Sequence, residues 1–378
     1  MFNKLKPNLS NMHAALLLMG LTGVVIHNWR LWQQDRALAD RLRAEHPPVP
    51  TLIRTPKVST LVAAWNEGSQ IEAHLRSFLE LTYPDIELIL CAGGTDETYV
   101  RALRYAGPHV TVIEQQPGEG KQRALARCLE YATGEIVYLT DADCLFDDEA
   151  LTRLLAPLVN EGEQVATGSS RLLDEQMEQI LPRHLWAAEM VSDAHRSTIS
   201  DGLLGRNAAL TRNAIAHIGG LNYQAPTGTD YQLAKRLLQI GLTIRFVRES
   251  VVSTGYPETF ITYQRKQSRW LRNLLIYGPV YEAWKDVAAT RRTLAIGLGM
   301  LLLPVVGLRL RPVLLLWFLL LSHGMLARLR YASFSTRLSG HPVPAMLFAA
   351  IPALTMADVV VWSMPLLDLI DSARRSRW

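Results

Sequence analysis

Two aspartates separated by a single alanine, Asp141 and Asp143, follow a short apolar run in the segment IVYLTDADCLF. In an extended chain, side chains two residues apart point the same way, so both carboxylates can address one ion. Carboxylate oxygens suit Mg²⁺ or Mn²⁺ bound jointly with a substrate diphosphate, and such an ion would neutralise charge on a departing diphosphate. The competing interpretation is a solvated acidic turn, or a helix cap near Asp147.

Other polar residues stand at the starts of predicted helices or in turns. Asp230 precedes a run with apolar residues at helical spacing, where an N-cap would explain it. Lys121 begins another helical stretch, and an exposed lysine at a helix start is its alternative. The pair Asn66-Glu67 follows the first predicted strand, where ordinary turn chemistry competes with a binding role. Residue types alone leave both interpretations open at each position.

The segment YQRKQSRWLRNLL carries a further candidate element. Its Arg269 could pair with diphosphate oxygens, and Trp270 offers a flat, amphipathic surface to an acceptor sugar or lipid. The structural alternative is an amphipathic helix whose basic and aromatic residues lie at the lipid headgroups. The two interpretations are compatible.

Short strands rich in β-branched residues alternate with helical stretches before the two aspartates. The predicted strands are Val58–Ala64, Ile86–Cys91, Val110–Glu114 and Ile136–Thr140, and the predicted helices are Ser69–Leu81, Glu97–Tyr105 and Lys121–Ala132. This alternation predicts an α/β domain with right-handed crossovers and a mostly parallel sheet flanked by helices. Such sheets bind ligands at the carboxyl ends of their strands, where Asp141 and Asp143 stand.

An apolar run from Ala14 to Ile26 predicts a membrane anchor near the N-terminus. It is shorter than the roughly 20 residues that cross a bilayer. No small-residue cleavage site follows, so an uncleaved anchor is favoured over a secretory signal peptide. Prolines at 47, 48 and 50 then end the charged helical stretch that continues the anchor.

After Tyr277 the chain becomes apolar again, which predicts two to four further membrane segments. The apolar runs are Thr293–Leu308, Pro312–Ala327 and Val343–Ile370, the last interrupted by Pro352, Asp358 and Pro365. The arginine-rich tail after Ile370 indicates a cytosolic C-terminus, whereas three spans counted from a cytosolic domain would place it outside. We therefore expect three parts: an anchor and linker helix (1–50), a catalytic domain (51–270), and an interfacial helix with membrane segments (271–378).

Composition supports a membrane partner and no nucleic acid. The formal net charge of +4 is too small to argue for nucleic-acid binding. Arginines flank the apolar segments, as in Arg328-Leu329-Arg330, which suits anionic lipid headgroups. The three cysteines form neither a metal-type pair nor a disulfide framework, which fits a reducing cytosol.

Residues 58–270 resemble the family 2 glycosyltransferases, which have a nucleotide-binding fold of the so-called A type. The likeness is carried by VSTLVAAWNEGSQIEAHLRSFLELTYPDIELIL, CAGGTDET and GEGKQRALARCLEYATGEIVYLTDAD. It implies that Asp143 binds the metal and that Asp141 binds the donor ribose or belongs to the metal shell. The donor-binding residues that it implies are Asn66, Glu67, Asp96, Lys121 and Asp141.

The same resemblance implies that Asp230 is the general base on the acceptor hydroxyl. The family usually has Thr-Glu-Asp here, and this chain has Gly228-Thr229-Asp230. An attacking alcohol must lose its proton as the new bond forms, and attack opposite the diphosphate inverts the anomeric centre. The loop Gly205-Arg206-Asn207 resembles one that precedes this aspartate and could shape the acceptor side, although a glycine-bearing turn explains it as well.

Two further departures from the family bear on the substrates. A UDP-sugar is expected, but Cys91-Ala92 replaces an acidic pair of which one acid helps to recognise the base, so the base stays open. Membrane-bound members carry Gln-x-x-Arg-Trp, and here Lys266 stands in place of the glutamine before Arg269 and Trp270. These last two are expected on the acceptor and diphosphate side of the site.

Together these features predict a metal-dependent inverting glycosyltransferase at the cytosolic membrane face. It would move a sugar from a nucleotide-diphosphate donor to a membrane-associated lipid or glycan acceptor. A processive polysaccharide synthase of the cellulose, chitin or hyaluronan type is the alternative enzyme. An inactive membrane-bound protein that binds nucleotide sugars or scaffolds a synthase is the alternative outside catalysis, against which the retention of Asp141, Asp143 and Asp230 argues.

Overall fold

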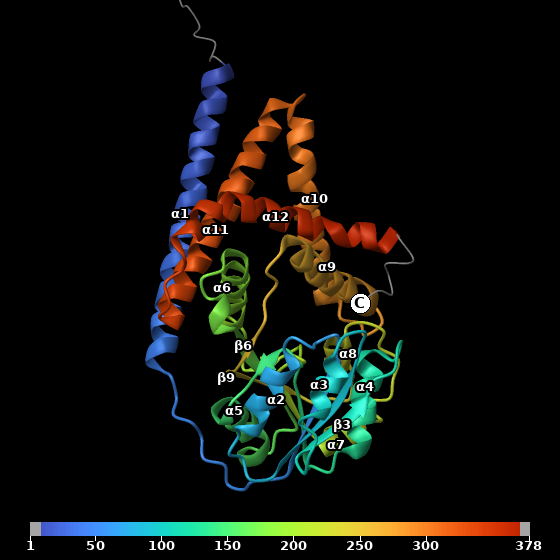
Figure 1. Cartoon of the computed structure of the whole chain (residues 1–378). Helices are drawn as coiled ribbons and strands as arrows, with labels where there is room; N and C mark the ends of the chain where they lie inside the picture. Colours follow the sequence, from blue (N-terminus) through green and yellow to red (C-terminus); the bar gives the residue numbers. More distant parts are fainter. Residues whose placement is uncertain (1–8, 371–378) are drawn as a thin grey trace, which may run out of the picture.

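The computed structural model describes residues 9–370 and arranges them in layers. A domain with one curved sheet lies below a group of long apolar helices, and two helices, α6 and α9, lie between them (Figure 1). The helices are α1 (Leu9–Ala44), α2 (Ile71–Leu79), α3 (Thr98–Leu103), α4 (Gly120–Tyr131), α5 (Asp148–Asn160), α6 (Ile180–Ala194), α7 (Arg212–His217), α8 (Thr229–Gln239), α9 (Phe260–Tyr277), α10 (Trp284–Gly307), α11 (Arg311–Ser339) and α12 (Ala345–Ile370).

The sheet has the strand order β3-β2-β1-β4-β8-β6-β9-β5, with β7 paired to β9. The strands are β1 (Val58–Trp65), β2 (Ile86–Gly93), β3 (Val110–Glu114), β4 (Ile136–Leu139), β5 (Cys144–Leu145), β6 (Val165–Leu172), β7 (Ile199–Ser200), β8 (Ala208–Thr211) and β9 (Ile244–Thr254). The four predicted strands are confirmed as β1 to β4 and pair in parallel. Beyond β4 the sheet is mixed, because β8 enters antiparallel to both β4 and β6.

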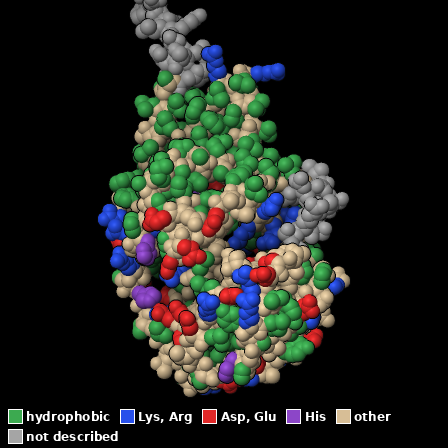
Figure 2. Space-filling model, viewed as in Figure 1, with side chains coloured by type: hydrophobic (Ala, Val, Ile, Leu, Met, Phe, Trp, Pro, Cys, Tyr) green, Lys and Arg blue, Asp and Glu red, His purple; other side chains and the backbone are tan. Residues whose placement is uncertain are grey.

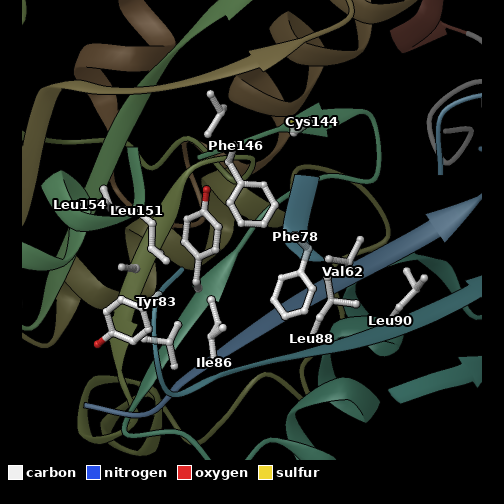
Figure 3. Close-up of a cluster of buried hydrophobic side chains, with 14 of the residues drawn as sticks. Val62, Phe78, Tyr83, Ile86, Leu88, Leu90, Cys144, Phe146, Leu151 and Leu154 are labelled. Carbon is white, nitrogen blue, oxygen red and sulfur yellow. The ribbon is translucent and has the colours of Figure 1, made fainter. Parts of the chain in front are cut away.

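Each face of the sheet buries its own hydrophobic core because side chains alternate along the strands. On β1, Val58 and Val62 face the layer that contains α2 and α5, where Phe78 and Leu151 also lie (Figure 3). Leu61, between them in the chain, belongs to the opposite core with residues of α4 and α8. Because of the same alternation, the side chains that follow each strand also point to defined faces of the sheet.

Four helices are long and apolar enough to cross a membrane: α1, α10, α11 and α12. The predicted anchor and linker helix form one continuous helix of 36 residues, which ends at Ala44 just before Pro47. The first two predicted apolar runs lie in α10 and α11, which a short connection before Arg311 joins. Pro352 and Pro365 lie inside α12 without ending it, so that apolar run is a single helix.

The four apolar helices do not share one direction. α1, α10 and α11 stand upright, whereas α12 runs across their lower part, directly above α9 (Figure 1). The upright group is covered with hydrophobic side chains, and charged residues gather at its lower end and around the hollow beneath it (Figure 2). α6 packs on α11 and α9 packs on α12, so these two helices connect the sheet domain to the membrane-type layer.

Candidate active site

The two aspartates of the predicted metal motif follow β4 at the carboxyl edge of the parallel strands. The chain turns sharply there, with Cys144 N–H donating to the Asp141 carbonyl over 3.1 Å. β5 then pairs with β9, which places Thr254 so that its hydroxyl donates to Asp143 Oδ2 over 3.4 Å. Both carboxylates are half-buried and lie on a well-supported turn.

Two loops at the ends of β1 and β2 bring a third carboxylate to this edge. Asn66 has a positive φ of 61°, and its Oδ1 accepts from Thr95 N–H over 2.7 Å. Asp96 accepts from Gly68 N–H over 2.9 Å. These bonds fix the position of Glu67, whose burial, together with the charges of Asp143 and Asp141, raises the pKa of the Glu67 carboxyl to about 7. Asn66 and Asp96 thus stabilise the loops through these hydrogen bonds. Glu67 lies near Asp141 and Asp143.

Lys121 connects the metal motif to the predicted general base. From the first turn of α4 it forms an ion pair with Asp141. It also lines a small pocket together with Gly205 and Asp230. Burial alone would lower the pKa of Lys121, but Asp141 and Asp230 outweigh it and raise that pKa. The structure therefore brings Asp230 to the same cleft as Asp141.

Asp230 lies in the first turn of α8, but it is not the cap. The N-cap is Gly228, with a left-handed φ of 66°. A side chain at Gly228 would also press on Asn273 of α9, whose amide lies 3.1 Å from the Cβ position. Gly205 similarly leaves room for Asp230, whose Cβ would lie 2.9 Å from an added methyl group. The helix-cap interpretation of Asp230 is wrong.

Helix α9 presents one stripe of residues to the sheet domain. At its C-terminal end Asn273 accepts from the Thr227 hydroxyl over 2.8 Å. Lys266 lies two turns earlier in the helix. Burial and the charge of Arg206 lower the pKa of Lys266, and the charges of Asp143 and Asp141 act in the opposite direction. Helical spacing places Arg269 and Trp270 on the same stripe between them, with Trp270 still 53% exposed.

A cluster of which the sequence analysis named only Arg206 adjoins the acidic site. Glu189 of α6 accepts from Arg206 over 2.6 Å and from the Tyr256 hydroxyl over 2.8 Å. Ser170 donates to the same carboxylate over 2.9 Å. The only sequence signal for Glu189 was that a glutamate stands inside an apolar helical stretch. Asn207, next to Arg206, is buried and bonds strand carbonyls, which makes it structural.

The residues present fit a divalent metal that is shared with a substrate. Within residues 9–370, no three His, Cys, Asp or Glu side chains form a preformed metal site. Mg²⁺ and Mn²⁺ sites of this kind use one or two carboxylates plus substrate phosphates. Burial and, after it, the charges of Asp143 and Asp141 raise the pKa of Glu67, so three carboxyl groups lie near enough to one another to offer oxygen donors to a cation.

Comparison with known proteins agrees with this geometry. A family model described as glycosyltransferase like family 2 matches residues 56–273. The chain is 25% identical over 233 residues to the probable glycosyltransferase YdaM of Bacillus subtilis, covering 57% of this chain and 55% of that protein. It is 23% identical over 239 residues to an N-acetylglucosaminyltransferase of Rhizobium meliloti, covering 58% and 55%. The chain thus spans about half the length of these curated relatives.

The fold of the whole chain is also similar to a solved structure. The mannosyltransferase PcManGT from Pyrobaculum calidifontis, in complex with GDP-Man and Mn²⁺, superposes with a TM-score of 0.52 at 20% sequence identity. The superposition covers 94% of this chain and 99% of that one. It therefore extends beyond the sheet domain to the long helices.

Proposed function

Since the chain belongs to the glycosyltransferase like family 2, we propose that it transfers a sugar from a nucleotide-diphosphate donor to a membrane-associated acceptor, with inversion and with a divalent metal. The observation that carries this proposal is the convergence of four carboxylates, Glu67, Asp141, Asp143 and Asp230, around Lys121. They come from three separate segments, the loop after β1, the turn after β4 and the first turn of α8, and meet at the carboxyl edge of the parallel strands. A structural ion pair between Lys121 and Asp141 would not require the other three.

Each residue has a separate task in the proposed reaction. Asp143, together with Asp141, would hold Mg²⁺ or Mn²⁺, which would supply positive charge to the diphosphate. Lys121 orients Asp141 and adds a second positive charge beside the departing phosphate. Asp230 takes the proton of the acceptor hydroxyl as its oxygen bonds to the anomeric carbon. The bond from that carbon to the diphosphate breaks on the opposite face, and the nucleoside diphosphate leaves.

The loops at β1 and β2 would hold the nucleoside. Asn66 and Asp96 fix the backbone there through Thr95 and Gly68, so we assign them to shaping the donor pocket. Glu67 lies between these loops and the aspartates. A UDP-sugar remains the first donor to test. Because the buried Cys91 stands where the family has an acid that helps to recognise the base, the panel includes sugars on other nucleotides as well.

The arrangement of the apolar helices supports a lipid acceptor at the cytosolic face. We propose that α1, α10 and α11 span the bilayer and that α12 lies along its inner surface (Figure 1). Basic residues are concentrated at the ends near the sheet domain: Arg41, Arg43, Lys285, Arg291, Arg292 and Arg337. Cytosolic loops carry such an excess. After the sheet domain the chain would cross twice, with α10 and α11, so the surface helix α12 and Ile370 lie on the same side as that domain. The arginine-rich tail lies outside the described residues.

The test is a donor and acceptor panel with the detergent-purified full chain. We expect transfer from one sugar nucleotide to a component of host lipid extract, lost with EDTA and restored by Mn²⁺ or Mg²⁺. Mass spectrometry of the product reports the sugar, the acceptor and the number of transfers. A long polymer would support the processive alternative. Absence of both transfer and hydrolysis with every donor would favour the inactive binding protein and defeat the proposal.

A further inference from the structure

The small pocket beside Lys121 and Asp230 contains two polar side chains that have no task in the reaction above. Only Lys121, Gly205 and Asp230 among its lining residues are partly exposed, so the pocket meets the cleft on their side. Gln122 of α4, Thr229 of α8 and five leucines, all buried, form the rest of its wall. The pocket therefore leads from the cleft into the space between α4 and α8.

The amide of Gln122 has one half bonded and one half free. Its Nε2 donates to the Leu221 carbonyl over 2.6 Å. Because a carbonyl oxygen can only accept, this contact determines which end of the amide faces Leu221. The other end, Oε1, is buried and has no hydrogen-bond partner within residues 9–370. The Gln122 side chain is only 3% exposed, so bulk water does not replace that partner.

Thr229 contributes a second unpaired group to the same pocket. It is the first residue of α8 and is 7% exposed, and its hydroxyl also lacks a partner among the described residues. A buried polar group without a hydrogen bond lowers stability. One hydroxyl group in the pocket would satisfy both side chains, because it can donate to Gln122 Oε1 and accept from Thr229 Oγ1.

The size of the pocket limits what can enter it. Its free volume is about 10 Å³, which is roughly the space that one water-sized group needs. A single hydroxyl fits this volume, whereas an acetamido group is several atoms too large. The leucines that form most of the wall offer nothing to a charged group, which would lose its hydration there. The pocket thus suits one small, uncharged group that forms hydrogen bonds.

The position of the pocket indicates which substrate brings this group. In the proposed reaction the acceptor oxygen approaches the anomeric carbon from the side of Asp230, and the diphosphate leaves on the side of Lys121. The sugar ring must therefore lie between these two residues, and both of them line the pocket. The groups that can reach the pocket from there are the substituents of the sugar.

We propose that Gln122 and Thr229 bind one hydroxyl group of the sugar that is transferred, and that they select donors which carry this hydroxyl. This inference rests on the proposed function of the donor site. A site that hydrogen-bonds a substrate hydroxyl discriminates against an analogue without it, because the analogue leaves the buried polar groups unpaired. An ordinary water molecule shares the chemistry of a hydroxyl, so the experiment must distinguish the two.

The experiment separates the contribution of the sugar from that of the nucleotide. The full chain in neutral detergent with Mn²⁺ is titrated calorimetrically with UDP, GDP, UDP-glucose, UDP-galactose, UDP-N-acetylglucosamine and GDP-mannose. The ratio of the Kd of a nucleoside diphosphate to that of its sugar derivative measures what the sugar adds. The variants are Thr229→Val, which removes only the hydroxyl, and Thr229→Ser, which keeps it. Thr243→Val makes the same change at an exposed residue beyond the other end of α8.

We expect Thr229→Val to bind UDP or GDP like the wild type but to bind the preferred sugar nucleotide about tenfold more weakly. Thr229→Ser and Thr243→Val should keep the affinity that the sugar adds. Monodeoxy analogues of the preferred donor then identify the hydroxyl. One analogue should bind the wild type about tenfold more weakly than its parent, and should lose no further affinity in Thr229→Val.

Two results would overturn the inference. An unchanged sugar contribution in Thr229→Val would do so, and so would equal binding of all monodeoxy analogues to the wild type, which would mean that water fills the pocket. If Thr229→Val does not fold, the analogues with the wild type decide alone. Failure of every nucleotide to bind the wild type would instead defeat the donor-site proposal.

Discussion

At the scale of single residues, the site separates metal binding from proton transfer. Asp143 lies near Glu67, and among the described residues it bonds only Thr254 and the Cys144 thiol, so its oxygens are available to a cation. Asp230 lies across Lys121, close to Gly205. The two aspartates can therefore be removed one at a time with different consequences.

We expect Asp143→Asn to weaken Mn²⁺-dependent nucleotide binding and to abolish turnover. Asp230→Asn should bind the nucleotide normally but lower kcat by about 100-fold or more, because a general base contributes about that factor. Calorimetry and initial rates separate the two effects. Asp85→Asn is the control, since that side chain is exposed and directly precedes β2, at the opposite edge of the sheet from the site. Near-wild-type kcat in Asp230→Asn would remove that residue from the mechanism.

At the scale of elements, one buried carboxylate ties the membrane-type helices to the two helices that carry site residues. Asp358 of α12 forms an ion pair with Arg328 of α11. It also accepts from the Tyr263 hydroxyl of α9 over 2.6 Å and lies 3.4 Å from His184 Nε2 of α6. Lys266 follows Tyr263 by one turn, so this contact sets where α9 lies over the cleft.

Removing that carboxylate should be costly, because it leaves a buried arginine without a partner. We expect Asp358→Asn to lower the free energy of unfolding by about 3–5 kcal/mol. The matched control is Asp40→Asn, which breaks the exposed pair between α1 and Arg337 and should cost at most about 1 kcal/mol. Denaturation in detergent compares them. Equal losses in both variants would show that the Asp358 contacts do not organise these helices.

At the scale of the whole molecule, the direction of α12 decides on which side of the membrane the chain ends. Leu310 lies at the tip of the α10–α11 hairpin and Leu367 near the end of α12; both are exposed. The native thiols at positions 91, 128 and 144 are buried, so single introduced cysteines report their own location.

In intact cells, an impermeant maleimide should label Leu310→Cys but not Leu367→Cys. After permeabilisation both should react, because α12 lies along the inner surface in the proposed arrangement. Pro342→Cys, in the exposed connection between α11 and α12, should behave like Leu367→Cys and controls for access to that side. Labelling of Leu367→Cys in intact cells would mean that α12 crosses the bilayer.

The sequence by itself determined the elements whose pattern is local. Short runs rich in β-branched residues mark buried strands within a few residues, and this is why β1 to β4 and the turn with Asp141 and Asp143 were predicted nearly to the residue. The apolar runs that became α10, α11 and α12 were equally visible, since length and hydropathy are properties of one segment.

Only the tertiary structure decided which distant residues meet. β8 enters the sheet antiparallel, which no local pattern specified. The chain encodes Glu189, Arg206 and Lys266 far apart, and only the packing of α6 and α9 over the sheet brings them to Tyr256. In the sequence Asp358 only interrupts an apolar run, whereas in the folded chain it forms an ion pair with Arg328. Contacts between distant segments depend on how whole faces fit together, and periodicity within a segment carries no record of that fit.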